Sequence, residues 1–352
     1  MNKKEIIANL IGGKTNSQKK YGEAFAPSNI ALCKYWGKRQ EQLNLPMTNS
    51  LSISLGNKGT YTKIELNYEP RDVVYLNGEV VDCNNKFYVN LVKFLDLFRS
   101  QGLSFKITTN SNIPIGAGVA SSASGFAAVV KALNDLFAWN LPQSSLSILA
   151  RLGSGSASRS LWHGFVEWVA GDEVNGLDSF ATPLPYSWQD LRIGLLLFST
   201  KPKHISSRMA MSATVKTCPF YSLWPARVAT AITEIKAAIL THDFTKFGEI
   251  TENNAIEMHA LMLATKPAII YSTADTILGM QQIWRAREAG VAVYFTQDAG
   301  PNLKLFFLEK EQEKIKDIFP NVEIIDPWDS TVNISHCASS LRGALSKETI
   351  NA

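Results

Sequence analysis

A stretch of small residues at positions 112–125 has the composition of a phosphate-binding loop. It reads Asn-Ile-Pro-Ile-Gly-Ala-Gly-Val-Ala-Ser-Ser-Ala-Ser-Gly. Gly116 and Gly118 lack a Cβ atom, so the backbone there can bring its N–H groups close to a bulky anion. If a helix begins at residues 120–122, its unpaired N–H groups and the hydroxyls of Ser121 and Ser122 face that anion. The spacing therefore predicts a site for the phosphates of a ligand.

The alternative for this loop is a glycine-containing turn before a core helix, which would be favoured if Gly-x-Gly stood alone. The preceding proline, the serine pair and the flanking strand and helix patterns favour the phosphate interpretation. The loop is not a Walker loop, because no Lys-Ser or Lys-Thr closes it. It is not a dinucleotide fingerprint either, because its third glycine is misplaced.

A cluster of cations and aromatic residues precedes this loop in the sequence. Lys34, Lys38 and Arg39 stand beside Tyr35 and Trp36 within six positions. Three cations beside aromatic groups that can form hydrogen bonds suit a ligand bearing more than one phosphate. A solvated basic turn is the alternative, and the residue types alone leave both interpretations open.

A second loop of small residues, Gly-Ser-Gly-Ser-Ala-Ser-Arg-Ser at 153–160, holds a single arginine, Arg159. A guanidinium in such a loop can bind a carboxylate or a phosphate through two parallel hydrogen bonds. A flexible linker is the alternative, but the apolar run 161–169 follows at once and weakens it. Residues 201–208 form another cationic turn with hydroxyls, for which a merely solvated loop fits equally well.

Asp298 follows an apolar strand pattern at 291–296 and begins the sequence Asp-Ala-Gly-Pro-Asn. These residue types are usual in a plain turn. A rigid strand can, however, aim the carboxylate that ends it into a cleft, which makes Asp298 a candidate acid. His259 lies among apolar helix positions and is interpreted as a structural histidine.

The composition excludes several other classes of protein. The chain has 352 residues, 45% of them hydrophobic and 19% charged, with a net charge of +4. This net charge is smaller than expected for a protein that binds nucleic acid. Four cysteines far apart indicate neither a zinc site nor a disulfide framework. The N-terminus does not read as a signal peptide, and no stretch has the length of a membrane span, so a cytoplasmic location is expected.

The elements that must position these residues follow from periodicity. Alternating patterns predict strands at 50–55, 60–66, 103–109, 191–198, 291–296 and 303–308, and Asn77-Gly78 predicts a hairpin turn. Helical periodicity predicts helices at 86–98, 126–137, 226–242, 244–262 and 268–289. The expected fold is α+β with two lobes: a mixed N-terminal lobe and a helix-rich C-terminal lobe with an antiparallel sheet.

The chain divides by composition into four parts. Residues 1–22 are expected to be a peripheral segment with a short amphipathic piece at 6–11. Residues 23–185 form the first lobe and residues 186–340 the second, with a Gly-, Asp- and Pro-rich connection at 170–189. Residues 341–352 form a polar tail.

Four of these segments together resemble the diphosphomevalonate decarboxylase family. They are Ala-Pro-Ser-Asn-Ile-Ala with Lys-Tyr-Trp-Gly-Lys-Arg at 26–39, the loop 114–124, the loop 153–160, and Asp-Ala-Gly-Pro-Asn at 298–302. The family belongs to the superfamily of galactokinase, homoserine kinase, mevalonate kinase and phosphomevalonate kinase. The resemblance implies ATP-dependent decarboxylation of mevalonate 5-diphosphate to isopentenyl diphosphate, with Mg²⁺, a cleft between two lobes and a homodimer.

The resemblance also implies a role for individual residues. The catalytic set is Asp298 beside the 3-hydroxyl, Arg159 on the substrate carboxylate and Lys34 paired with the aspartate. The substrate-binding positions are Asn29, Tyr35, Trp36, Lys38, Ser156, Ser207 and Arg208. The nucleotide-binding positions are Asn110, Gly116, Gly118, Ser121 and Ser122. No direct side-chain ligand for the metal is assigned, with Ser122 as a candidate.

The chemistry of the residues agrees with these implied roles. Loss of CO2 from a β-hydroxy acid needs a better leaving group than hydroxide, which phosphorylation of the tertiary hydroxyl supplies. The protein must then neutralise several phosphates, orient one hydroxyl and hold one carboxylate. Lys34 should keep Asp298 ionised, which favours orientation of the hydroxyl with late proton acceptance. The alternatives are a phosphomevalonate decarboxylase, a mevalonate 3-kinase and a non-catalytic sensor.

Overall fold

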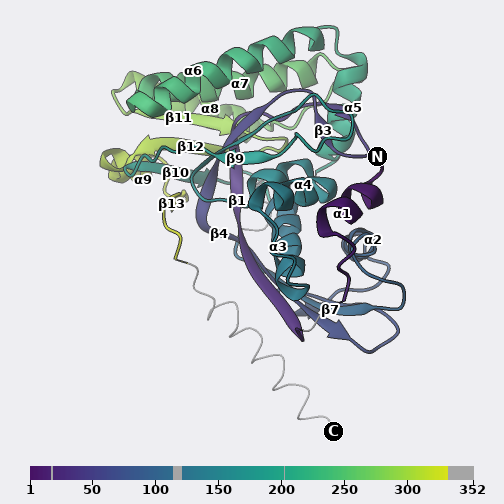
Figure 1. The fold of residues 1–352 in the computed structure, drawn as a ribbon. Coiled ribbons are helices and arrows are strands. Elements are labelled where there is room, and N and C mark those ends of the chain that lie inside the picture. The colour runs from purple at the N-terminus through teal and green to yellow at the C-terminus, as the bar shows by residue number, and fades with distance from the viewer. Residues whose placement is uncertain (17–18, 114–120, 202, 332–352) are drawn as a thin grey trace.

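The computed structural model describes residues 1–16, 19–113, 121–201 and 203–331 (Figure 1). The N-terminal elements are α1 (Lys3–Ile11), β1 (Tyr21–Cys33), β2 (Lys38–Gln40), β3 (Leu45–Pro46), β4 (Ser50–Asn67), β5 (Val73–Leu76), β6 (Glu79–Val80), α2 (Lys86–Leu95), β7 (Ser104–Ser111), α3 (Ser121–Leu136), α4 (Gln143–Gly153), the 3₁₀ helix η1 (Gly155–Arg159), β8 (Phe165–Trp168) and β9 (Ala181–Pro183).

The C-terminal elements begin with a strand and continue mainly as helices. They are β10 (Leu191–Leu196), α5 (Ser207–Thr217), η2 (Tyr221–Leu223), α6 (Trp224–Thr241), α7 (Phe244–Leu263), α8 (Ala274–Glu288), β11 (Val293–Gln297), β12 (Leu303–Leu308), η3 (Glu309–Glu311), α9 (Gln312–Ile318) and β13 (Glu323–Ile325). The fold is α+β, as predicted.

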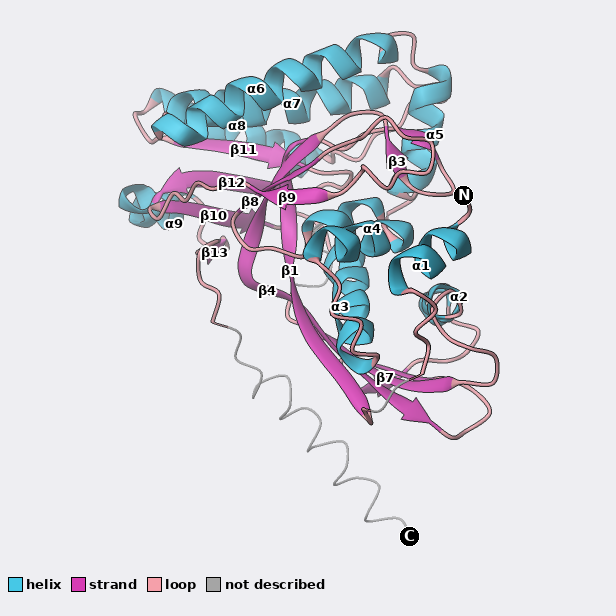
Figure 2. Ribbon diagram, viewed as in Figure 1, coloured by secondary structure: helices cyan, strands magenta, loops and turns pink. Residues whose placement is uncertain are grey.

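The larger sheet belongs to the N-terminal lobe. Its strands run in the order β6-β5-β7-β4-β8-β9, with β1 also paired to β4. The pairs are antiparallel except β5 with β7. Asn77 and Gly78 both have positive φ and join β5 to β6, which confirms the predicted hairpin. Figure 2 shows α1 to α4 gathered on one side of this sheet.

The smaller sheet belongs to the C-terminal lobe and has the order β11-β12-β10-β13, with antiparallel pairs. Helices α6, α7 and α8 form the layer beside β11 (Figure 1). Their apolar faces explain this packing: Ile235 and Ile239 on α6 and Phe247 on α7 are fully buried. The predicted helix-rich second lobe is therefore present. No helix in the described ranges combines the length and apolarity of a membrane span.

The two lobes share part of their hydrophobic core. One cluster lies within the N-terminal lobe and another within the C-terminal lobe. A third joins Ile30 and Ile53 of the larger sheet to Ile193 of the smaller sheet and Phe247 of α7. The lobes are consequently held in a fixed relation, which matters for a site built from both. The predicted boundary at 185 and 186 stays a prediction.

Three local expectations differ from the structure. The N-terminal segment is not peripheral as far as α1 is concerned, because Ile6, Ile7 and Ile11 are buried in the core. The two strands expected at 50–55 and 60–66 are one long strand, β4, in which Gly56 takes a positive φ. The cationic turn at 201–208 ends in a helix, because Ser206 caps the start of α5. The tail from residue 332 lies outside the described residues.

Candidate active site

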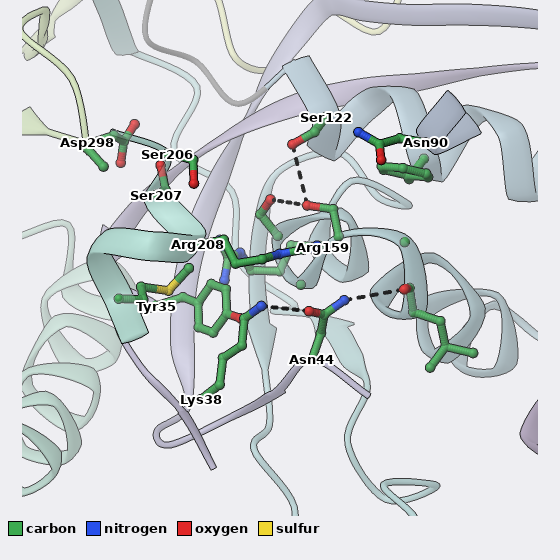
Figure 3. A pocket seen from close by; sticks show the side chains of 18 of the residues that line it. Tyr35, Lys38, Asn44, Asn90, Ser122, Arg159, Ser206, Ser207, Arg208 and Asp298 are labelled. Carbon is green, nitrogen blue, oxygen red and sulfur yellow. Dashed lines mark hydrogen bonds between the residues drawn. The ribbon is translucent and has the colours of Figure 1, made fainter. Parts of the chain in front are cut away.

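A cavity of about 680 Å³ contains most of the residues singled out in the sequence. Figure 3 shows its labelled side chains converging from the segment after β1, from β2, α2, α3, η1 and α5, and from the turn after β11. Of the predicted residues in the described ranges, those lining it are Asn29, Lys34, Tyr35, Trp36, Lys38, Ser122, Ser156, Arg159, Ser207, Arg208 and Asp298. Residues from both lobes therefore meet in one cavity, with Asp298 and Arg159 both in its wall.

Asp298 is held by two lysines, one on each carboxylate oxygen. Lys34 Nζ lies 2.8 Å from Oδ1 and Lys304 Nζ lies 3.4 Å from Oδ2. Both lysines are buried, whereas the Asp298 side chain keeps 24% of its surface exposed toward the cavity. Burial alone would raise the pKa of Asp298, but Lys34 and Lys304 outweigh it and hold this pKa far below its usual range. Asp298 is an anion at neutral pH.

The backbone around Asp298 is fixed by short-range hydrogen bonds. β11 ends at Gln297, and the Gly300 N–H donates to the Asp298 carbonyl at 2.7 Å. Gln297 Nε2 donates to the Gly300 carbonyl at 2.8 Å. His259 Nε2 lies 3.2 Å from the Asp298 carbonyl, and burial, aided by Lys34, lowers its pKa to about 4. His259 is therefore neutral and contacts the backbone of the acid, in line with a structural role.

Arg159 ends η1 and is almost fully buried. Its guanidinium donates to Ser50 Oγ, lies 3.4 Å from Asn29 Oδ1, and sits over the Trp168 ring at 5.8 Å. Burial lowers its pKa to about 10, partly offset by Asp298, so it stays protonated. Its buried Nε has no hydrogen-bond partner among the described residues. A buried cation with a spare donor in a cavity wall is suited to bind an anion.

The end of the cavity near β2 and α5 collects cations. Lys38 Nζ donates to Asn44 Oδ1 at 2.7 Å, and Arg208 lies close by in the first turn of α5 (Figure 3). Burial, followed by the charge of Arg208, lowers the pKa of Lys38 to about 8. The Tyr35 hydroxyl is buried without a hydrogen-bond partner in the described part of the chain. Repelling cations and an unused hydroxyl fit a phosphate group.

The predicted nucleotide loop is only partly described. Gly116 and Gly118 lie outside the described residues, as does the side chain of Ser121. The described part of the chain is helical from Ser121 onward, as α3, and Ser122 Oγ lies 3.4 Å from Ser154 Oγ beside the second loop. Asn110 lies on β7 and is not among the described residues that line the cavity. The nucleotide roles of all these residues stay predictions.

Beyond Ser122, the cavity extends along α2. It is lined there by Lys86, Asn90, Lys93, Phe94 and Leu97, which sequence reasoning did not single out as site residues. Helical periodicity places one side of α2 against the core, and the polar residues of its first turns face the cavity. This part of the cavity, the α2 arm, has an apolar wall formed by Phe94 and Leu97, with the cations Lys86 and Lys93 beside it.

Sequence reasoning also missed Lys304, Asn44 and Lys3. Lys304 is fully buried on β12, in the sequence Leu-Lys-Leu-Phe-Phe-Leu. A lysine inside an apolar strand two residues after Asp-Ala-Gly-Pro-Asn is a signal that could have identified it, because buried lysines need a partner. Asn44 and Lys3 carry no comparable signal.

A two-lobed α+β fold with an ionised acid, a buried guanidinium and a cation-lined pocket defines an enzyme that acts on a phosphorylated small molecule. Comparisons with known proteins give the family. Residues 26–181 match the model of the diphosphomevalonate decarboxylase-like N-terminal domain, and residues 193–350 match that of the mevalonate 5-diphosphate decarboxylase C-terminal domain. The chain belongs to the diphosphomevalonate decarboxylase family.

Individual relatives agree over most of the chain. The diphosphomevalonate decarboxylase of Aspergillus fumigatus is 37% identical over 334 residues, covering 86% of this chain and 81% of the relative. The crystal structure of mevalonate diphosphate decarboxylase from Staphylococcus aureus has a TM-score of 0.82 at 37% identity, covering 87% of this chain and 95% of that one. A structure of MDDEF in complex with MVAPP, AMPPCP and magnesium has a TM-score of 0.81 at 37% identity, covering 86% and 95%.

Proposed function

We propose that this protein decarboxylates mevalonate 5-diphosphate with ATP, releasing isopentenyl diphosphate, ADP, phosphate and CO2. The observation that carries the proposal is the pairing of Asp298 with Lys34 and Lys304 in a cavity that also contains Arg159. Family membership and the complex of a relative with MVAPP, AMPPCP and magnesium support it.

The diphosphate of the substrate would bind at the cationic end of the cavity. Lys38 and Arg208 supply charge there, and Tyr35 and Ser207 supply hydroxyls. Diphosphate binding would relieve the mutual repulsion of Lys38 and Arg208 and give the Tyr35 hydroxyl a partner. Trp36 is only 2% exposed, so we assign it to support of this wall rather than to a polar contact.

The substrate carboxylate would bind Arg159. Asn29 holds the guanidinium through its Oδ1, and its Nδ2 donates to Ser160 Oγ at 2.7 Å and to the Ser156 carbonyl at 3.3 Å. This network fixes the direction of the guanidinium before the substrate arrives. Ser156 borders the same space through its contact with Ser154 Oγ at 3.3 Å.

Asp298 would orient the tertiary hydroxyl for transfer of a phosphoryl group. Because two ammonium groups stabilise its anion, it is a weak base and accepts the proton late, as the oxygen–phosphorus bond forms. The C–O bond to the new phosphate then breaks, and positive charge grows on the tertiary carbon. The electron pair of the C–C bond to the carboxylate quenches this charge as CO2 leaves, forming the alkene. Arg159 holds the carboxylate in line for this loss.

The nucleotide would lie between Ser122 and the α2 arm, with Lys86 and Lys93 near its phosphates. The residues fit such a ligand, since the arm combines an apolar wall at Phe94 with cations. Bound ATP supplies the phosphoryl group, and Mg²⁺ neutralises its charge. The described ranges hold no group of three or more His, Cys, Asp or Glu side chains that could bind a metal. Mg²⁺ usually keeps several waters and binds substrate phosphates, with Asp298 or Ser122 as candidate contacts here.

One assay separates this function from its alternatives. Purified protein is supplied with ATP, Mg²⁺ and mevalonate 5-diphosphate, and CO2 and ADP are followed together. Equal amounts of both are expected. ADP without CO2 would indicate a 3-kinase, neither product would indicate a sensor, and preference for the monophosphate would indicate phosphomevalonate decarboxylase. A cytoplasmic homodimer is part of the proposal, and light scattering on the purified protein tests the dimer.

A further inference from the structure

Helix α1 lies outside the part of the chain that the family models match, since the first model begins at residue 26. The helix is nevertheless firmly attached to the N-terminal lobe. Asn2 and Glu5 form a capping box at its start, and the buried Ile6 and Ile7 anchor it in the core. The position of the first helical residue, Lys3, is therefore set by packing.

Lys3 reaches the cationic end of the cavity and lines it. Its Nζ donates to the Leu152 carbonyl at 2.7 Å. Asn44 Nδ2 lies 3.3 Å from the same carbonyl oxygen, and Asn44 Oδ1 accepts the hydrogen bond from Lys38. Lys3 and Lys38 are thus connected through one backbone carbonyl and one amide side chain, and Asn44 is seen between Lys38 and α4 in Figure 3.

Arg208 completes this group from the other lobe. It lines an adjoining hollow together with Lys3 and Asn44. Burial, followed by the charge of Arg208, lowers the pKa of Lys3, and Lys3 in turn contributes to the lowered pKa of Lys38. Glu41, which also lines this hollow, acts in the opposite direction on Lys38. Three cations that repel one another around a shared space have the electrostatics of a site for an anion with several charges.

We propose that Lys3 is a substrate-binding residue, which contacts the diphosphate group of the substrate together with Lys38 and Arg208. Helix α1 is then part of the active site and not an appendage of the family fold. This inference rests on the proposed function for the identity of the ligand. An ammonium has three donors, and the bond to Leu152 uses one, so two remain to be directed at phosphate oxygens.

The competing explanation is that Lys3 only caps the carboxyl end of α4, where Leu152 lies in the last turn. Lys3→Gln separates the two explanations, because glutamine keeps a donor for the Leu152 carbonyl and removes the charge. Lys3→Arg keeps the charge. Lys14→Met is the control, because Lys14 is an exposed cation shortly after the same helix that lines neither the cavity nor the adjoining hollow.

The experiment measures KM and kcat for mevalonate 5-diphosphate and, by calorimetry, the Kd of inorganic diphosphate. Lys3→Gln is expected to raise both KM and Kd about tenfold, the loss of one charge-assisted hydrogen bond, with little change in kcat. Lys3→Arg should stay within about threefold of the parent protein, as should Lys14→Met. Loss of thermal stability in Lys3→Gln with KM and Kd equal to those of Lys14→Met would overturn the proposal.

The two measurements also distinguish failure of this inference from failure of the proposed function. If the parent protein does not decarboxylate the substrate, but Lys3→Gln still weakens binding of inorganic diphosphate about tenfold, the site stands without the reaction. If turnover is normal and Lys3→Gln leaves both constants unchanged, the reaction stands and Lys3 is structural.

Discussion

Replacement of Lys304 by methionine tests the two-lysine arrangement around Asp298. Methionine has nearly the length of lysine and suits an apolar strand, so the buried space on β12 stays filled. Asp298 keeps Lys34 on its other oxygen and is partly exposed to the cavity, so its charge is not left without a partner. The change therefore removes one charge from the acid and, with it, the hydrogen bond of Lys304 Nζ to the Asn302 carbonyl at 3.4 Å.

The size of the effect follows from the separation of the charges. At 3.4 Å, Coulomb's law gives about 1 kcal/mol with the screening of water and about 5 kcal/mol at an effective dielectric constant of about 20. Each pKa unit corresponds to about 1.4 kcal/mol, so loss of Lys304 should raise the pKa of Asp298 by roughly one to three and a half units. The exposed part of the carboxylate favours the lower half of this range.

The measurement is the pH dependence of kcat/KM, together with a melting curve at each pH. Because the reaction needs ionised Asp298, the rate falls as pH drops through the pKa of this group. The acid limb of Lys304→Met should therefore lie about one to three and a half pH units above that of the parent protein. Lys310→Met, an exposed lysine just beyond β12, is the control and should not shift. An unshifted acid limb in a folded Lys304→Met protein would refute the reasoning.

Three further changes test other parts of the site. Asp298→Asn should reduce turnover by about a thousandfold or more. The Kd for inorganic diphosphate, measured by calorimetry, should stay within about tenfold of that of the parent protein. Loss of diphosphate binding as well would show that the carboxylate is structural. Because the pKa of Lys38 is about 8, kcat/KM should fall above that pH, and Lys38→Arg should remove this alkaline limb in a pH–rate profile. A Cβ at Gly155 would lie 2.7 Å from the Tyr35 hydroxyl, so Gly155→Ala should raise KM about tenfold. Gly125→Ala should leave KM unchanged, because no atom of the described residues lies within 4 Å of a Cβ there.

The periodic elements could be predicted because their burial follows from local patterns. The helices α6 and α7 lie close to their predicted ranges because each has one apolar face directed at the core. The strands β10, β11 and β12 do so because they are mainly apolar segments that are buried along almost their whole length. The helix expected from residue 268 begins only at Ala274, where Thr273 forms a cap after Pro267. The short strand β13 was missed, because its three residues carry no period of their own and are ordered by pairing with β10.

The site could be predicted as far as its residues stand in distinctive local sequences. Arg159 could be predicted because it is a lone arginine among small residues. Asp298 could be predicted because it directly follows an apolar strand pattern. Asn44, Lys3 and the polar face of α2 have no such local signal. They reach the cavity only through tertiary packing, and Lys3 does so because isoleucines one turn further along α1 are buried.

The two cations on Asp298 differ in how they depend on the fold. Lys304 lies on β12, and Asp298 directly follows the neighbouring strand β11, in which Thr296, two residues before the acid, pairs with Lys304. Lys34 directly follows β1 in the other lobe, so its bond to Asp298 exists only while the lobes are packed together. Any change that loosens the shared core between the lobes should therefore remove the contact with Lys34 before that with Lys304. The acid would then stay ionised at neutral pH through Lys304 but lose the direction and the charge that Lys34 gives it, so turnover would fall and the acid limb would move to higher pH.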